Sequence, residues 1–347
     1  MKEHTVSLKW SSNNVLILEE NSLRDIKSNE VLVKVISCGI CGSDLKILKH
    51  GNPRLVQGRI MGHEIAGEII QVGPNVNVFK IGDKVSIGAD IPCQECDACK
   101  TKHNKCENNL AFGHEIDGGF SRYMFLNNDH LENGPIEKFE GLNFDLASLA
   151  EPLACCINGY EKVNFMPYES VLILGGGTIG MMLSFLATLH KIPNVYIADI
   201  ANERIENFKQ FDFLTKSFNL RDENIFNWKE KNNSFDLIFT ANNNPISQKQ
   251  AVDLIDSRGV INFFGGLPKD QSEVEINTNK IHYKEAIVTG SHGSTPKQHK
   301  EAVNIIINNA SFFEKLISKK FPLKDYKTAF KEASNPRNFK IILNPNS

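Results

Sequence analysis

The stretch that most constrains the fold lies near the middle of the chain, where a short apolar run meets a cluster of glycines. Residues Val171 to Leu174 are all apolar, as in a parallel strand that is buried on both faces. They lead into GGGTIG, residues 175–180, and then into residues 181–189, which have the character of a helix. Strand, glycine turn and helix in this order predict a dinucleotide-binding βαβ unit.

Each glycine of the turn has a separate expected task. Gly175 permits the tight turn, Gly177 lets the backbone approach a pyrophosphate, and Gly180 allows the helix to pack closely. The N-terminus of the helix favours the anion. The candidate cofactor-binding residues are Gly175, Gly177, Thr178, Ile179 and Gly180, together with Asp199 and Arg204 farther along the chain.

Asp199 follows the second apolar strand, residues 194–198, where its carboxylate can accept hydrogen bonds from the ribose hydroxyls of an adenosine. A 2′-phosphate would bring a like charge against it, although Arg204 could offset that charge. We therefore expect NAD as the cofactor, with NADP less favoured. The alternative interpretation of Asp199 is a turn residue at the end of a strand.

The alternation of strands and helices continues beyond this unit. Further strands are expected at 235–240, 259–264 and 286–289, with a helical stretch between the first two. This is the pattern of a doubly wound parallel sheet. We assign residues 152–290 to this Rossmann domain.

The rest of the chain predicts a second, β-rich domain. Short apolar runs such as 31–36 and 65–72 are separated by glycines and turn residues, which suits a compact barrel of short strands. The closing run, 339–343, is expected to return to this domain as a strand. Residues 1–151 and 291–347 would then form one discontinuous domain in an α/β protein.

Four of the eight cysteines are bunched between positions 93 and 106. A single loop with four thiols can surround a tetrahedral Zn²⁺, and four thiolates leave no coordination position open for a substrate. We expect a structural zinc in this lobe rather than four free thiols, with an iron-sulfur centre as the lesser rival. The ligands would be Cys93, Cys96, Cys99 and Cys106.

A second group of metal-binding side chains lies nearer the N-terminus. Cys41-Gly-Ser-Asp44 is followed after about twenty residues by Gly62-His-Glu64, so that a thiol, a hydroxyl, an imidazole and carboxylates occur in a short span. We interpret this span as a catalytic metal site.

Composition excludes other classes of function. With 39 basic and 41 acidic residues the net charge is −2, so the chain lacks the excess of positive charge that attracts nucleic acid. The N-terminus lacks the apolar core of a signal peptide, and no run of about 18 apolar residues could span a membrane. We expect a cytoplasmic protein with a small-molecule substrate.

Several motifs together make the chain resemble the zinc-containing medium-chain dehydrogenases and reductases, the family of zinc alcohol, sorbitol and threonine dehydrogenases. The resemblance covers essentially the whole chain. It implies a GroES-like catalytic domain, a Rossmann domain and a homo-oligomer, either dimer or tetramer. The motifs are Cys41-Gly-Ser-Asp44, Gly62-His-Glu-Ile-Ala-Gly67, Gly82-Asp-Lys-Val85, the cysteine lobe, Glu151-Pro-Leu153 and the 175–180 turn.

The resemblance also assigns the ligands of a catalytic zinc. Cys41 and His63 match the thiolate and imidazole ligands, and Glu64 matches a carboxylate that binds the metal directly in the sorbitol-type branch. Glu151 stands where liver-type alcohol dehydrogenases carry a cysteine and the polyol and threonine branches carry a glutamate. The rival interpretation of Glu151 is a carboxylate that complements the start of a helix.

The resemblance also implies roles for two residues that follow Cys41. Ser43 would carry the proton of the alcohol away from the zinc, and Asp44 would hydrogen-bond His63 and so fix the orientation of its ring. Members of the family often have a histidine at the position of Lys46, so this chain needs a different exit for the proton.

These parts imply an NAD-dependent dehydrogenase with two zinc ions per chain, which oxidises a secondary alcohol of a polyol, sugar alcohol or related compound to a ketone. Zinc acts as a Lewis acid on the substrate oxygen, and the cofactor accepts the hydride. The alternatives are threonine or a simple alcohol as the substrate. From a different class comes a non-catalytic protein that binds NAD and zinc.

Overall fold

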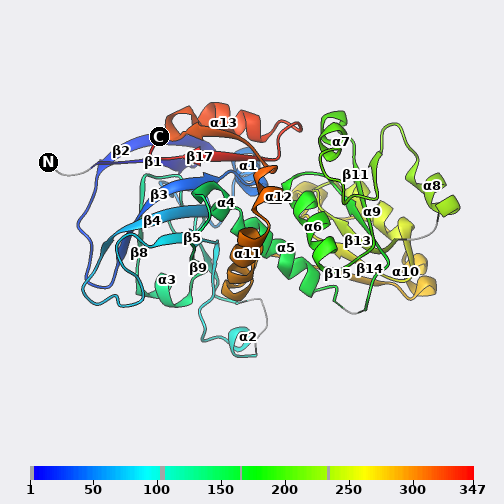
Figure 1. Ribbon diagram of the computed structural model, residues 1–347, viewed down its shortest axis with the longest axis horizontal. Coiled ribbons are helices and arrows are strands. Elements are labelled where there is room, and N and C mark those ends of the chain that lie inside the picture. The colour runs from blue at the N-terminus through cyan, green and yellow to red at the C-terminus, as the bar shows by residue number, and fades with distance from the viewer. Residues whose placement is uncertain (1–3, 102–105, 165, 233–234) are drawn as a thin grey trace. The chain divides into compact units, whose positions relative to one another are not determined.

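The computed structural model describes residues 4–101, 106–164, 166–232 and 235–347 (Figure 1). The chain divides into two compact units, one of Met1–Ala154 with Gly293–Ser347 and the other of Cys155–His292. The first division falls within helix α5 (Ala150–Glu161). The domain boundaries expected from the sequence, after 151 and after 290, lie a few residues before these divisions.

The second unit is built on a six-stranded sheet in which every neighbouring pair of strands is parallel. Its order is β12-β11-β10-β13-β14-β15, which is 3-2-1-4-5-6 when the strands are counted along the chain, as in a dinucleotide-binding fold. The elements are β10 (Ser170–Leu174), α6 (Thr178–Leu189), β11 (Asn194–Asp199), α7 (Asn202–Phe208), β12 (Lys216–Asn219), α8 (Ile225–Asn232), β13 (Phe235–Thr240), α9 (Pro245–Leu254), β14 (Ile255–Phe263), η1 (Lys269–Gln271), α10 (Thr278–Lys284) and β15 (Ile287–Gly290).

Burial explains why the apolar run at the centre of this sheet forms a strand. All five residues of β10 are buried, and Leu172 lies beside Tyr196 of β11 on one side and Ile238 of β13 on the other. A strand between two parallel neighbours, with helices packed on the sheet, has no face left for polar side chains. The predicted doubly wound sheet is confirmed, and β15 lies at one of its edges. Oligomerisation stays a prediction.

The first unit contains a seven-stranded, mostly antiparallel sheet of order β16-β17-β3-β4-β5-β9, with β8 paired to β3, and two two-stranded sheets. Its elements are β1 (His4–Ser11), β2 (Val15–Ser22), β3 (Val31–Gly39), α1 (Gly42–His50), β4 (Glu64–Val72), β5 (Lys84–Ile87), β6 (Asp90–Ile91), α2 (Asp97–Lys100), β7 (Leu110–Ala111), β8 (Tyr123–Leu126), α3 (Asn128–Asn133), β9 (Ile136–Lys138), α4 (Phe144–Ser148), α11 (Pro296–Asn308), α12 (Ala310–Glu314), β16 (Ile317–Pro322), η2 (Leu323–Asp325), α13 (Tyr326–Ala333) and β17 (Lys340–Asn344).

The return of the C-terminal strand to this sheet is the feature that matters most for the site. β17 runs antiparallel to β3, with Ile342 opposite Gly39, and β3 runs antiparallel to β4, with Gly39 opposite Glu64. The first residue of β17 and the first residue of β4 therefore meet beside the last residue of β3. Figure 1 shows the same arrangement, with β17 beside β3 in the sheet.

The described part of the chain contains no helix that is long and apolar enough to cross a membrane.

The glycine turn offers a test of the fold. A Cβ at Gly180 would lie 1.9 Å from the carbonyl oxygen of Gly175, so Gly180→Ala must push α6 away from the turn. We expect this overpacking to lower the free energy of unfolding by about 1–3 kcal/mol. Urea unfolding followed by circular dichroism measures the change. Gly266→Ala is the control, because a Cβ there meets no atom within 4 Å, and equal unfolding midpoints for the two variants would contradict the prediction.

Candidate active site and metal-binding residues

Cys41 lies where β3 has ended and α1 begins. It is the N-cap residue of α1, and its backbone N–H donates to Asp44 Oδ2 at 2.9 Å in a capping box. The same Gly-Ser-Asp sequence that marks the motif thus also starts the helix.

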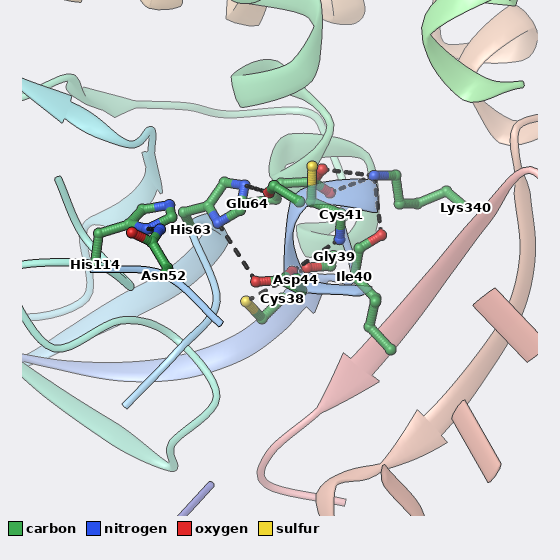
Figure 2. Close-up of polar contacts among 11 residues, drawn as sticks. Cys38, Gly39, Ile40, Cys41, Asp44, Asn52, His63, Glu64, His114 and Lys340 are labelled. Carbon is green, nitrogen blue, oxygen red and sulfur yellow. Dashed lines mark hydrogen bonds and ion pairs between the residues drawn. The ribbon is translucent and has the colours of Figure 1, made fainter. Parts of the chain in front are cut away.

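Three predicted ligands come together. One donor atom each from Cys41, His63 and Glu64 lies within 4.8 Å of the others (Figure 2). His63 and Glu64 are buried, and Cys41 is half-buried. A sulfur, a nitrogen and an oxygen donor at this spacing suit Zn²⁺, and three protein ligands leave a fourth position open, as catalytic zinc sites do.

Asp44 and Ser43 contact opposite sides of the His63 ring. Asp44 Oδ1 lies 3.7 Å from His63 Nδ1, longer than a hydrogen bond, while Ser43 Oγ lies 3.4 Å from His63 Nε2. Burial alone would lower the pKa of His63, but the anions of Asp44, Cys41 and Glu151 raise it well above its usual value. The predicted hydrogen bond from His63 to Asp44 stays a prediction at this distance.

Glu151 stands apart from the other three predicted ligands. It lies in the first turn of α5 and is buried, but its oxygens are not in the group of donor atoms within 4.8 Å. Burial raises the pKa of Glu151 to about 7, with His63 opposing the shift and Glu64 adding to it. Direct binding of a metal by Glu151 stays a prediction.

The donors fit a divalent cation. His63 Nδ1 and Asp44 Oδ1 are buried without a hydrogen-bond partner, and burial raises the pKa of Asp44 as well as that of Glu151. A dication beside such a group favours the ionised carboxylates and offsets their mutual repulsion. The chemistry of the site therefore favours a metal among Cys41, His63 and Glu64.

Lys340 is a member of the site that the sequence did not reveal. Its Nζ donates to both carboxylate oxygens of Glu64 at 2.6 Å and to the carbonyl oxygen of Ile40 at 3.3 Å. Burial opposes its charge, but Glu64 and Cys41 raise the pKa of Lys340 above its usual value. A Cβ at Gly39 would lie 1.9 Å from Glu64 Oε2, so the strand end must be glycine for this pair to form.

His114 lies on the other side of His63, although the sequence assigned it no role. The two imidazole rings are 5.5 Å apart, and Asn52 Nδ2 lies 3.4 Å from His114 Nδ1 (Figure 2). The loops that carry Asn52 and His114 are joined again by an ion pair between Arg54 and Glu115. No family pattern marked these residues in advance.

Cys38 belongs to the core. Its side chain is fully buried in β3, and burial raises the pKa of its thiol well above the usual value. Cys38 is therefore a core thiol and not one of the donor atoms that converge with His63 and Glu64.

The four cysteines of the lobe also converge. Cys96 Sγ lies 3.6 Å from Cys99 Sγ and 3.9 Å from Cys106 Sγ, and all four sulfur atoms lie within 4.8 Å of one another. Sulfur atoms at about 2.3 Å from a tetrahedral Zn²⁺ would be about 3.8 Å apart. None of the cysteines forms a disulfide, so Cys93, Cys96, Cys99 and Cys106 fit a closed zinc site.

In the second unit, Asp199 organises the glycine turn. Asp199 Oδ2 accepts from Gly176 N at 2.7 Å and from Arg204 Nη1 at 2.9 Å, and Oδ1 accepts from the backbone N–H groups of Ile200 and Ala201. Burial opposes ionisation, but Arg204 and the Gly176 N–H keep the pKa of Asp199 below its usual value. Gly175 has φ +111°, which glycine adopts without strain, and Gly177 is the N-cap residue of α6.

Known proteins resemble the chain over nearly its whole length. D-altritol 5-dehydrogenase of Agrobacterium fabrum is 27% identical over 94% of this chain and 95% of its own. D-arabitol-phosphate dehydrogenase of Enterococcus avium is 25% identical over 94% of this chain and 92% of its own. A structure described as a zinc-binding dehydrogenase of Sinorhizobium meliloti, bound to NADP, superposes with a TM-score of 0.90 at 23% identity over 99% of this chain and 100% of that one.

Two family models together match most of the chain, and the second covers all of Cys155–His292 and extends into the first unit on both sides. Residues 27–135 match the alcohol dehydrogenase GroES-like domain, and residues 145–344 match the glucose dehydrogenase C-terminus. The chain therefore belongs to the family of zinc-type medium-chain alcohol and polyol dehydrogenases.

Proposed function

We propose that the protein oxidises a secondary hydroxyl of an uncharged polyol to a ketone, with NAD as the hydride acceptor and two zinc ions per chain. The observation that carries the proposal is the convergence of Cys41, His63 and Glu64, with the buried Glu151 close enough to interact electrostatically with His63 and Glu64. Oxygen donors in place of a second thiolate suit hydroxylated substrates, because the metal can exchange its ligands. The names of the two relatives, an altritol and an arabitol-phosphate dehydrogenase, support a polyol.

The catalytic zinc would supply Lewis-acid stabilisation of the negative charge on the substrate oxygen. The chain's own residues do the rest. Cys41, His63 and Glu64 would hold the metal, with Glu151 as a fourth predicted ligand that water or substrate can replace, and Asp44 would orient the His63 ring. Ser43, whose Oγ lies 3.4 Å from His63 Nε2, would relay the proton of the substrate hydroxyl, releasing its own hydroxyl proton toward solvent as it takes up the substrate's.

The preference for NAD rests on Asp199 and Arg204. The carboxylate is ionised and buried, and the guanidinium that might have offset a 2′-phosphate is already paired with it at 2.9 Å. A 2′-phosphate would then meet a like charge at the site of the ribose hydroxyls. The NADP bound in the Sinorhizobium meliloti structure is a property of that protein.

An uncharged substrate is favoured by the charges on the loops beside His63. Arg54 is paired with Glu115, and Arg59 is paired with Asp117 at 2.9 Å. Each carboxylate lies on the loop that also carries His114, so both cations of the 52–59 loop are offset locally. A substrate phosphate would have to displace these partners before it could use either guanidinium.

Replacement of the thiolate ligand tests the metal chemistry. We expect Cys41→Ser to lower kcat by at least about a thousandfold, because Lewis-acid catalysis supplies several kcal/mol. Zinc content should fall from two ions per chain to one, while NAD binding, followed by fluorescence, stays intact. A zinc-free Cys41→Ser protein with full activity would rule out the mechanism.

Cofactor choice is tested at the end of β11. We expect Asp199→Asn to move the ratio of kcat/KM for NAD over NADP toward NADP by about tenfold to a hundredfold, because a like charge is removed. Steady-state kinetics with both cofactors measures the ratio. Asp212→Asn is the control, since Asp212 is exposed in the same unit. A ratio that is the same in Asp199→Asn and wild type would refute the role of Asp199.

The substrate is tested by NADH formation with matched pairs of compounds in the presence of zinc. We expect kcat/KM for altritol or arabitol to exceed that for their phosphates. The reason is that Arg54 and Arg59 are already paired with carboxylates and would have to leave these partners to bind a phosphate. Threonine and simple secondary alcohols complete the panel. Higher activity with the phosphates would contradict the uncharged substrate, threonine turnover would favour the second substrate class, and inactivity with every compound would favour the non-catalytic protein.

A further inference from the structure

Lys340 is the only lysine or arginine among the buried residues in the described ranges of the chain, with 4% of its surface exposed. A buried ammonium is costly unless its charge is paired and its hydrogen bonds are made. Here three acceptors, the two oxygens of Glu64 and the carbonyl oxygen of Ile40, match its three N–H groups. Lys340 is thus paired and fully hydrogen-bonded at the edge of the metal site.

The partner of Lys340 is also a predicted zinc ligand. Both oxygens of Glu64 are 2.6 Å from Nζ, while one lies within 4.8 Å of donor atoms of Cys41 and His63. A carboxylate has enough lone pairs to face an ammonium and a metal together. The two cations nevertheless repel each other and draw on the same charge, so each weakens the hold of the other on Glu64.

The acidic groups around the site indicate what the sharing of Glu64 between Lys340 and a metal would achieve. Cys41, Asp44, Glu64 and Glu151 bring four acidic groups together, of which the three carboxyl groups are buried and Cys41 is half-buried. Without a lysine, a dication in this region would be held by an excess of anions. A second buried cation reduces that excess, and so reduces the attraction that holds the metal.

We propose that Lys340 is a positioning residue that shares Glu64 with the catalytic zinc, and thereby keeps this zinc exchangeable and its coordination open to a substrate hydroxyl. The inference rests on the proposed function, since it assumes a metal at Cys41 and His63. Figure 2 shows the geometry, with Lys340 reaching Glu64 from the side of β17 and His63 on the far side of the carboxylate.

The test measures zinc release rather than turnover. The zinc-loaded protein is mixed with an excess of chelator, and the slow and fast phases of zinc release are followed with a metal indicator. The phase that is missing in Cys41→Ser is the release of zinc from the catalytic site. We expect Lys340→Met to slow this phase by about tenfold or more, because the variant removes a buried cation that repels zinc and competes with it for Glu64. The phase from the cysteine lobe should not change.

Three further variants separate positioning from a merely structural role. Lys340→Arg keeps the cation and should release zinc close to the wild-type rate. Lys340→Met combined with Glu64→Gln should release zinc as Glu64→Gln alone does, because the lysine acts through that carboxylate. Lys319→Met removes an ion pair of similar length, 2.8 Å to Glu332, on the neighbouring strand β16 and should leave release unchanged.

Thermal unfolding gives a second readout if Lys340→Met folds poorly without metal. The variant leaves Glu64 buried without its cation, which a metal can replace but water cannot. The rise in Tm on zinc loading should therefore be larger in Lys340→Met than in the wild type. An equal rise in both proteins, or unchanged or faster zinc release, would overturn the inference.

The outcomes also separate this inference from the proposed function. A wild-type protein that holds one zinc per chain, in the lobe alone, would overturn both. A wild-type protein with two zinc ions and polyol activity, but with zinc release that does not depend on Lys340, would overturn this inference only.

Discussion

The site depends on how a cluster of buried acids is balanced. Asp44, Glu64 and Glu151 are all buried, and the thiol of Cys41 lies among them at the start of α1. Acids that share a low-dielectric region raise one another's pKa and repel, unless cations are brought in. The protein supplies one such cation itself, Lys340, and the convergence of Cys41, His63 and Glu64 leaves a place for another. The fold of the first unit is what allows this concentration of charge.

The sequence predicted the parts of this arrangement that are coded locally. The apolar run of β10 followed by glycines and an apolar helix could hardly form anything but a strand, turn and helix, and the structure has them at Ser170–Leu174 and Thr178–Leu189. Cys41 and His63 could be named because each lies within a short motif. Edge strands were harder. β16, with the sequence ISKKFP, was not predicted, because an edge strand tolerates lysines and has no apolar pattern to reveal it.

Lys340 and His114 were missed for a different reason. Lys340 lies 276 residues from Glu64, and only the pairing of β17 with β3 and of β3 with β4 brings them together. A single lysine at the start of a strand looks like ordinary surface charge, since lysine is almost never fully buried without a partner. His114 contacts His63 from a loop. A loop has no periodic hydrophobic pattern from which the direction of a side chain could be predicted. Both contacts are properties of tertiary structure.

The two carboxylates at the chemical centres of the units are held in opposite ways. Asp199 accepts from three backbone N–H groups and from Arg204, so its position is tied to the main chain of the turn itself. Glu64 has both oxygens on the one ammonium of Lys340, at the end of a flexible side chain. Backbone donors cannot move without breaking the turn, whereas a lysine can shift with its partner. The first arrangement would suit a carboxylate that recognises a ribose, and the second would suit the sharing of Glu64 with a metal that we propose.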